Sequence, residues 1–112
     1  MTAPAGPAGP VGMVEAMSVF AVEYVYAPDS EADRDEHRPA HRAWLNGFVE
    51  SGRLLASGPF ADGEGALLLF TAESEAALLE ELKQDPFNIK QLVSGLKVTE
   101  WKPVTGAFAD YV

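Results

Sequence analysis

Two segments of this chain are apolar at both even and odd positions, a pattern that is unusual for a strand with one face in water. The first segment, SVFAVEYVYA (residues 18–27), is rich in β-branched and aromatic residues and predicts a strand. The second, ALLLFTA (residues 66–72), predicts a strand with leucines on both faces. Apolar strand faces avoid water, so we expect both strands to be covered on both faces.

A helical pattern follows the first of these strands. Four apolar side chains have the spacing of one buried helix stripe: Trp44, Leu45, Phe48 and Val49. Gly52 stands where a helix commonly ends. The start of the helix is ambiguous, because Pro39 is tolerated in a first helical turn but is costly inside a helix. Either the regular helix begins near Pro39, or an earlier turn that is capped by Asp29 or Ser30 kinks there.

The other patterns predict two shorter strands and a second helix. RLLASGP (residues 53–59) predicts a strand that a Gly-Pro pair stops, and GLKVTEWKPV (residues 95–104) predicts the last strand. Between them, Ser74 is expected to cap a helix whose inward residues are Ala77, Leu78 and Leu82. The sequence DPF (residues 85–87) stops this helix, and one more short turn is expected after it.

The predicted order of elements is β-α-β-β-α-β, which is typical of a ferredoxin-like α+β fold with an antiparallel sheet and both helices on one face. The helices would leave the second sheet face uncovered, although two of the strands are apolar there. A second copy of the chain is the simplest cover, so we expect a homodimer. The segment 1–16, rich in Ala, Pro and Gly, predicts a flexible tail, and residues 105–112 a C-terminal tail.

Composition narrows the classes of function. The chain has 112 residues and no cysteine, so disulfides and cysteine-based metal sites are excluded, and a cytoplasmic location is expected. The formal net charge of −9 disfavours binding to nucleic acid and to anionic membrane surfaces. No apolar run reaches the roughly 20 residues of a transmembrane helix. No phosphate loop or dinucleotide-binding fingerprint occurs, so we expect no cofactor.

Both histidines lie in the stretch HRPAHRAWL (residues 37–45). His41 precedes Trp44 by three residues and Leu45 by four, which places its imidazole on the apolar side of the predicted helix. Such a histidine is either packed in the core or acts in proton transfer, because its reference pKa near 6.5 suits a general acid or base. His37 and His41 have a spacing that can hold a metal, but no third ligand is indicated and no metal site is predicted.

Three motifs together resemble the YCII-related (YciI-like) family: RPAHRAWL, GRLLASGPF and DPF, followed by a closing strand with Trp101. The resemblance covers residues 18–102, within a domain expected at 17–104. It implies a dimeric α+β barrel and an active site built from a histidine and an aspartate, which fall on His41 and Asp85 as catalytic residues. Family members often have a glycine a few residues after DPF, where Gln91 stands here.

Other readings stay open for the candidate site residues. Asp85 precedes a proline, where aspartate is also ordinary turn chemistry. Ser57 and Arg38 are predicted to bind substrate, although Ser57 can equally be a strand-end serine. Arg38 and Arg42 can equally be solvated, or one of them can attract an anionic substrate. A Ser/His/Asp nucleophilic triad is disfavoured, because ASGP is not the G-x-S-x-G turn that such a serine needs.

The function predicted from the sequence is a small cofactor-free enzyme of this family. His41 and Asp85 would carry out acid–base chemistry, namely elimination or isomerisation, on a small cyclic or aromatic hydroxylated molecule. One family type, as the resemblance implies, is a dehydrochlorinase of chlorinated hydroxyquinols. The alternative is a non-catalytic dimeric module that binds a small ligand or another partner in the same pocket.

Overall fold

The computed structural model describes residues 17–111 of the chain. The predicted N-terminal tail, residues 1–16, lies outside the described residues, and so does Val112. The elements, in chain order, are β1 (Ser18–Tyr26), α2 (Glu31–Glu50), β2 (Leu54–Pro59), β3 (Gly65–Ala72), α3 (Glu75–Leu82), α4 (Pro86–Ile89), β4 (Val93–Trp101) and the short 3₁₀ helix η2 (Ala109–Tyr111).

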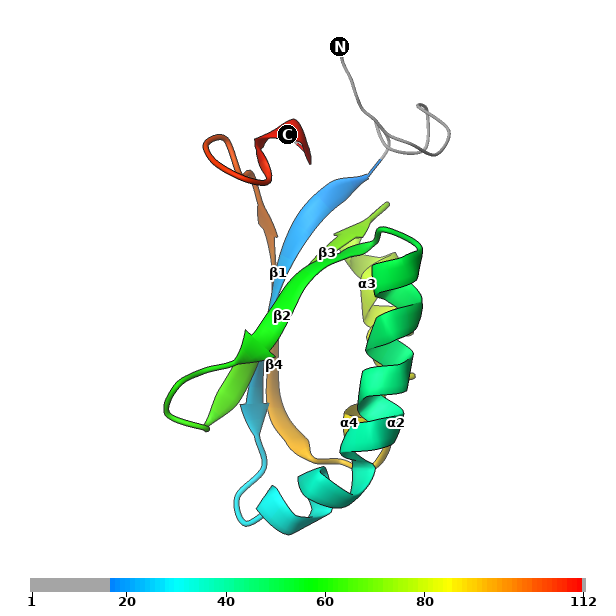
Figure 1. Ribbon diagram of the computed structural model, residues 1–112, viewed down its shortest axis with the longest axis vertical. Helices are drawn as coiled ribbons and strands as arrows, with labels where there is room; N and C mark the ends of the chain where they lie inside the picture. The colour runs from blue at the N-terminus through cyan, green and yellow to red at the C-terminus, as the bar shows by residue number, and fades with distance from the viewer. Residues whose placement is uncertain (1–16, 112) are drawn as a thin grey trace.

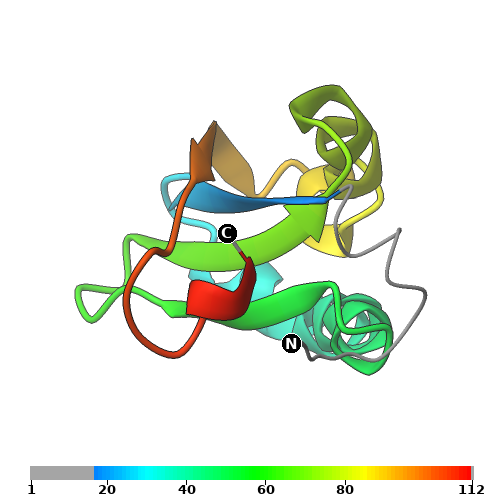
Figure 2. The same ribbon diagram turned by 90° about the horizontal axis from the view of Figure 1, so that it is seen from above.

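The four strands form one antiparallel sheet in the order β2-β3-β1-β4. The α helices all lie on one side of this sheet, and the C-terminal segment folds back near the end of the sheet where β1 begins (Figure 1; Figure 2). The split β-α-β order with two central strands, β1 and β3, is the ferredoxin-like arrangement. The predicted α+β fold class is therefore confirmed.

The core lies between the sheet and the helices and follows the alternation of side chains along the strands. Phe20, Val22 and Tyr24 of β1 face the helices and are at most 4% exposed. The aromatic ring of Phe48 on α2 packs edge-on against Phe70 of β3, with 5.3 Å between ring centroids. Trp44 lies against both rings. The helical stripe predicted around Trp44 and Phe48 thus makes the main contact of α2 with the sheet.

Two residues of the predicted helical stripes face solvent instead. Leu78 and Leu82 of α3 are buried as expected, but Ala77 is exposed, because successive residues are turned about 100° around a helix axis. Val49 is 54% exposed for the same reason, since it follows the inward Phe48 at the end of α2. The inward stripe of each helix is therefore narrower than the sequence pattern indicated.

Helix α2 begins at Glu31, eight residues before Pro39, so the second of the two alternatives for its start is correct. Proline lacks the N–H that would bind the carbonyl four residues earlier, and it bends helices. Figure 1 shows the first turns of α2, in cyan, at an angle to the rest of the helix. Ser30 is the N-cap residue, but its hydroxyl donates to the carbonyl of Ala27 and does not cap the helix.

The bounds of the last strand differ from the prediction by two or three residues. β4 begins at Val93 and ends at Trp101, and Pro103 after it is buried. In the turn before β4, Gln91 has a φ of +59°, the left-handed conformation that glycine adopts at the lowest cost. The position at which the family resemblance implies a glycine is therefore occupied here by a glutamine in the left-handed conformation.

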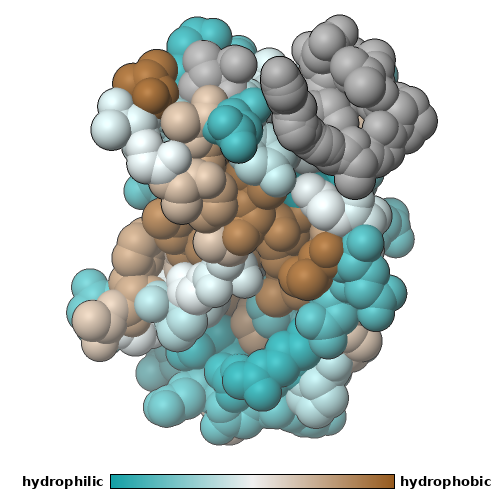
Figure 3. All heavy atoms as spheres, turned by 45° about the horizontal axis from the view of Figure 1, so that its top comes forward, coloured by the Kyte–Doolittle hydropathy of each residue, from teal (hydrophilic) through white to brown (hydrophobic). Residues whose placement is uncertain are grey.

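The sheet face opposite the helices is lined mainly by apolar and small side chains. On β1 this face carries Val19, Ala21, Glu23 and Val25, and the partners of Val19 and Glu23 on β4 are Trp101 and Lys97. Val25 is 54% exposed and Trp101 is 42% exposed. Figure 3 shows hydrophobic side chains gathered across the middle of the surface, beside the hydrophilic outer side of α2.

Gly65 at the start of β3 is required by the close approach of a neighbouring strand. A Cβ atom there would lie 1.9 Å from the carbonyl oxygen of Tyr24, which real structures do not tolerate. We expect Gly65→Ala to lower the free energy of unfolding by about 1–3 kcal/mol or more, because the two strands have to move apart. Urea denaturation of the purified protein measures this change.

Gly47→Ala is the matched control for Gly65→Ala. No atom lies within 4 Å of its added Cβ, and Gly47 lies inside a helix. Alanine there should raise the free energy of unfolding by about 0.5–1 kcal/mol. Equal effects of the two substitutions would show that the close approach at Gly65 does not constrain the sheet.

Candidate active site

His41 and Asp85, which are 44 residues apart in sequence, are in direct contact. The imidazole Nδ1 of His41 on α2 lies 2.7 Å from the carboxylate Oδ1 of Asp85, the residue just before α4. The Asp85 side chain is fully buried, whereas that of His41 is 15% exposed. The carboxylate therefore lies behind the imidazole, and only the imidazole reaches solvent.

Asp85 also organises the backbone around it. Its Oδ1 accepts a hydrogen bond from the backbone N–H of Phe87 at 3.0 Å, which makes Asp85 the N-cap of the short helix α4, with Pro86 in the first turn. Asp85 therefore has both roles that the sequence left open: it forms the turn before α4, and it contacts His41. The hydrogen bond from the backbone of α4 therefore holds the Asp85 carboxylate in one orientation.

A tyrosine on the sheet completes the set of donors to Asp85. The hydroxyl of Tyr24 donates to Oδ2 of Asp85 at 2.7 Å, and Nδ2 of Asn88 donates to the Tyr24 oxygen at 3.1 Å. Neither residue was singled out from the sequence, where Tyr24 counted only as an apolar strand position. The available signal was that a tyrosine facing a core needs a partner for its hydroxyl.

The contact with Asp85 sets the orientation and the tautomer of the imidazole. A carboxylate accepts hydrogen bonds, so Nδ1 of His41 carries the proton and donates it. The His41 ring is stacked on the ring of Phe87, with 3.9 Å between centroids and an angle of 4° between planes. In the neutral ring the lone pair is then on Nε2, which forms no hydrogen bond with any of residues 17–111. The arrangement can hold or release a proton at that atom.

A pocket of about 290 Å³ opens beside His41, between α2 and the strand β2. Ser57 and Arg38, the two residues predicted to bind substrate, line this pocket together with His41. Arg42 lines it as well, and so does Arg34, which was not singled out from the sequence. His37 is not among the residues that line the pocket. His41, Arg38 and Ser57 thus meet at one cavity, whereas Asp85 does not line it but contacts His41, which does.

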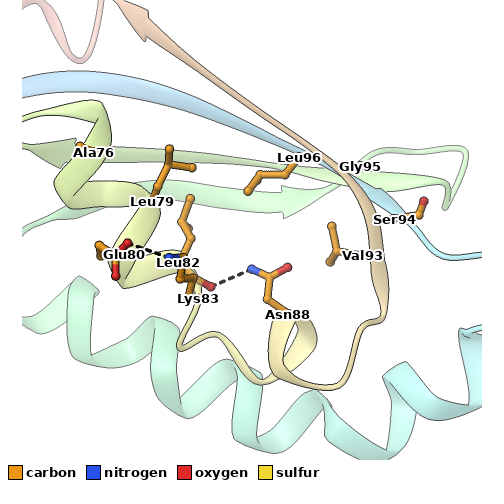
Figure 4. Close-up of a pocket in the computed structure, with 10 residues that line it drawn as sticks. All are labelled: Ala76, Leu79, Glu80, Leu82, Lys83, Asn88, Val93, Ser94, Gly95 and Leu96. Carbon is orange, nitrogen blue, oxygen red and sulfur yellow. Dashed lines mark hydrogen bonds and ion pairs between the residues drawn. The ribbon is translucent and has the colours of Figure 1, made fainter.

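A second, larger pocket lies on the other side of α4, and its lining offers few groups that could take part in a reaction. It has a volume of about 500 Å³ and runs between α3 and the edge strand β4 (Figure 4). Its two charged residues, Glu80 and Lys83, pair with each other at 2.7 Å. Asn88 faces this pocket and donates to the carbonyl of Leu82, as the dashed line shows. The smaller pocket is therefore the better candidate for a reaction site.

Within residues 17–111, no group of three or more His, Cys, Asp or Glu side chains is arranged to hold a metal ion. Over the same residues, no helix has both the length and the apolar character that a membrane span requires.

Burial strongly raises the pKa of the Tyr24 hydroxyl, and the nearby Asp85 carboxylate raises it further. The folded protein therefore keeps Tyr24 neutral, while in the unfolded chain it ionises near pH 10. Its contribution to stability is fully present below pH 10 and is lost as the pH rises further. We expect the free energy of unfolding to fall there by up to about 1.4 kcal/mol per pH unit for this group.

Urea unfolding between pH 9 and 11 measures this dependence. Tyr24→Phe should flatten the alkaline slope. A Tyr24→Phe variant with an unchanged slope would show that another group causes the loss of stability.

Comparison with known proteins gives a family and a fold. Residues 17–102 match the family model of the YCII-related domain. No curated protein matches the chain. Among solved structures, a similar one is the 5-chloro-2-hydroxyhydroquinone dehydrochlorinase TftG from Burkholderia phenoliruptrix, in complex with 2,5-dihydroxybenzoquinone. The two chains are 25% identical with a TM-score of 0.67, and the match covers 75% of this chain and 93% of that one.

A second similar structure is that of Rv0793 from Mycobacterium tuberculosis. It is 19% identical with a TM-score of 0.50, and the match covers 81% of this chain and 98% of that chain. At this identity the likeness concerns the fold alone.

Proposed function

Since this chain belongs to the YCII-related family, we propose that it is a cofactor-free enzyme in which His41 transfers protons on a small cyclic or aromatic hydroxylated substrate. The observation that carries the proposal is the pair of His41 and Asp85. One nitrogen of the imidazole is held by a buried carboxylate, and the ring borders a pocket that also contains Ser57 and Arg38. A histidine that served only for packing would not need to border a cavity.

The proposed chemistry uses the free nitrogen of His41. Nε2 takes a proton from a ring hydroxyl or a ring carbon, and the electron pair of the broken bond moves into the ring. In an elimination a leaving group departs with its bonding electrons, and in an isomerisation the imidazolium returns the proton to another ring atom. Asp85 is then a positioning residue, which holds Nδ1 and stabilises the imidazolium.

The substrate class is suggested by the similarity to the dehydrochlorinase, whose solved complex contains 2,5-dihydroxybenzoquinone. The match covers 93% of the dehydrochlorinase chain, so the two proteins are compared over nearly that whole domain. We therefore propose a single-ring hydroxylated molecule as substrate, with Ser57 as a hydrogen-bond donor and Arg38 as a further contact.

A turnover assay with a panel of chlorinated and unchlorinated hydroquinols tests this proposal. The wild-type protein should change the ultraviolet absorbance of at least one compound, and it should release chloride from a chlorinated one, at a rate above that in buffer. Binding of panel members without turnover would support the alternative, a non-catalytic binding module. If no compound of the panel is bound or turned over, both proposals are contradicted.

We also propose that the protein is a homodimer whose sheets face each other. The face opposite the helices carries the partly exposed side chains of Ala21, Val25 and Trp101, and a second copy presents the same apolar surface. We expect light scattering to give twice the 12.0 kDa of one chain, with at least about 800 Å² buried on each copy.

Val25→Asp should shift the protein towards monomer, because it places a charge on this face. Val49→Asp is its control, because Val49 is equally exposed, at 54%, but lies on α2. A wild-type mass of one chain at micromolar concentration would contradict the dimer.

A further inference from the structure

Three of the four arginines of the chain line the pocket beside His41: Arg34, Arg38 and Arg42. They follow one another at intervals of four residues, so they lie along one side of α2. None of the residues that line this pocket is an aspartate or a glutamate. In a chain with 17 acidic and 8 basic residues, this is a strong local excess of positive charge.

The three guanidinium groups are not neutralised equally. Arg38 forms an exposed ion pair with Asp35, which lies within one helical turn of it. Arg34 and Arg42 form no ion pair with any carboxylate among residues 17–111. By contrast Arg53, the fourth arginine, is outside the pocket and is bound by Glu81 and by the carbonyl of Thr71. Two positive charges at the pocket are therefore available to a ligand.

Arg34 is also held in place before any ligand binds. Its Nε donates to the hydroxyl of Ser30 at 2.9 Å, and its guanidinium carbon lies 4.0 Å from the ring centre of Tyr26. Both contacts leave the two terminal nitrogens of the guanidinium without a partner among the described residues. A planar guanidinium with two free N–H₂ groups matches the two oxygens of a carboxylate.

We propose that the substrate of this pocket carries a carboxylate on its ring, and that the free terminal nitrogens of Arg34 bind this group while the ring lies against His41. Arg42, eight residues further along α2, adds positive charge to the same pocket. The inference rests on the proposed function for the presence of a substrate and adds the charge of that substrate. The net charge of −9 repels anions at long range, so recognition of an anion has to come from arginines at short range. A pocket of about 290 Å³ holds one ring with such a group.

The experiment compares two probes that share a dihydroxylated ring and differ in one substituent, which is charged in the first and neutral in the second, by titration calorimetry with the full chain. One probe is 2,5-dihydroxybenzoate, and the other is the neutral 2,5-dihydroxybenzyl alcohol. The wild-type protein should bind the carboxylate at least 10-fold more tightly than the alcohol. Because the contacts are charged, this preference should decrease as the salt concentration rises.

Arg34→Gln should weaken binding of the carboxylate by about 10- to 100-fold, and Arg42→Gln, which removes a more distant charge, should weaken it less. Both variants should leave binding of the alcohol unchanged. Lys83→Gln removes the same charge from the residue that follows α3, outside this pocket, and should change neither affinity. Thermal unfolding of each variant shows that it is folded.

Equal binding of the two probes by the wild type would overturn the inference, and so would an unchanged carboxylate affinity in both arginine variants. These results do not depend on turnover. Failure of the proposed enzyme activity would therefore appear only in the turnover assay, while failure of this inference would appear only in the binding comparison.

Discussion

Asp85→Ala should destabilise the protein by about 3–5 kcal/mol, the largest effect on stability that we expect from any single substitution at the site. The fully buried carboxylate accepts hydrogen bonds from Tyr24, His41 and the backbone of Phe87. Alanine would leave all three donors without the carboxylate that accepts from them. An unsatisfied buried donor costs about 1–3 kcal/mol, and α4 would also lose its cap.

Chemical denaturation with urea measures this loss. Asp62→Ala is the control, because Asp62 accepts one backbone hydrogen bond in an exposed loop, and its removal should cost less than about 1 kcal/mol. If Asp85→Ala were no more destabilising than Asp62→Ala, the buried network around Asp85 would not hold the helices to the sheet.

The second large effect concerns activity. With a substrate found by the turnover assay, His41→Ala should lower kcat by about 10²- to 10⁴-fold, the usual loss when a general acid or base is removed. The fold should survive, because His41 lies at the edge of the core. His37→Ala is the matched control, since His37 lies four residues earlier on the same helix and does not line the pocket.

Asp85→Asn distinguishes a positioning role from a purely structural one. An amide has about the shape of the carboxylate but cannot stabilise imidazolium, so kcat and its pH profile should change while KM changes little. If His41 and Asp85 act as one unit, the double variant should be little slower than the slower single variant. Losses that multiply would contradict the pairing.

The sheet was predictable because each strand has a short-range signature. The apolar runs of β1 and β3 and the Gly-Pro stop of β2 are all readable from neighbouring residues. The start of α2 was ambiguous for the opposite reason. Its first two turns carry charged residues on nearly every side, so no apolar stripe indicates a helix before Pro39, and its packing is visible only in three dimensions.

The site was only partly predictable because it joins residues far apart in the chain. The family resemblance pointed to His41 and Asp85, but no spacing in the sequence shows that they touch. Tyr24 lies 61 residues from Asp85 on a different element. The alternation of side chains along β1 predicted only that Tyr24 faces the core. Arg34 precedes Pro39, and the sequence left open whether that segment belongs to the same helix as His41. Contacts of this kind depend on the assembled fold.

The two tryptophans divide the molecule into two halves that fluorescence can observe separately. Trp44 lies on α2 against Phe48 and Phe70, in the layer that contains the pocket. Trp101 lies at the end of β4, on the face that the helices leave open. A variant that keeps only Trp44 would respond to events in the helical layer, and one that keeps only Trp101 to events on the open face. Emission spectra could therefore report ligand binding and self-association as independent signals from one small chain.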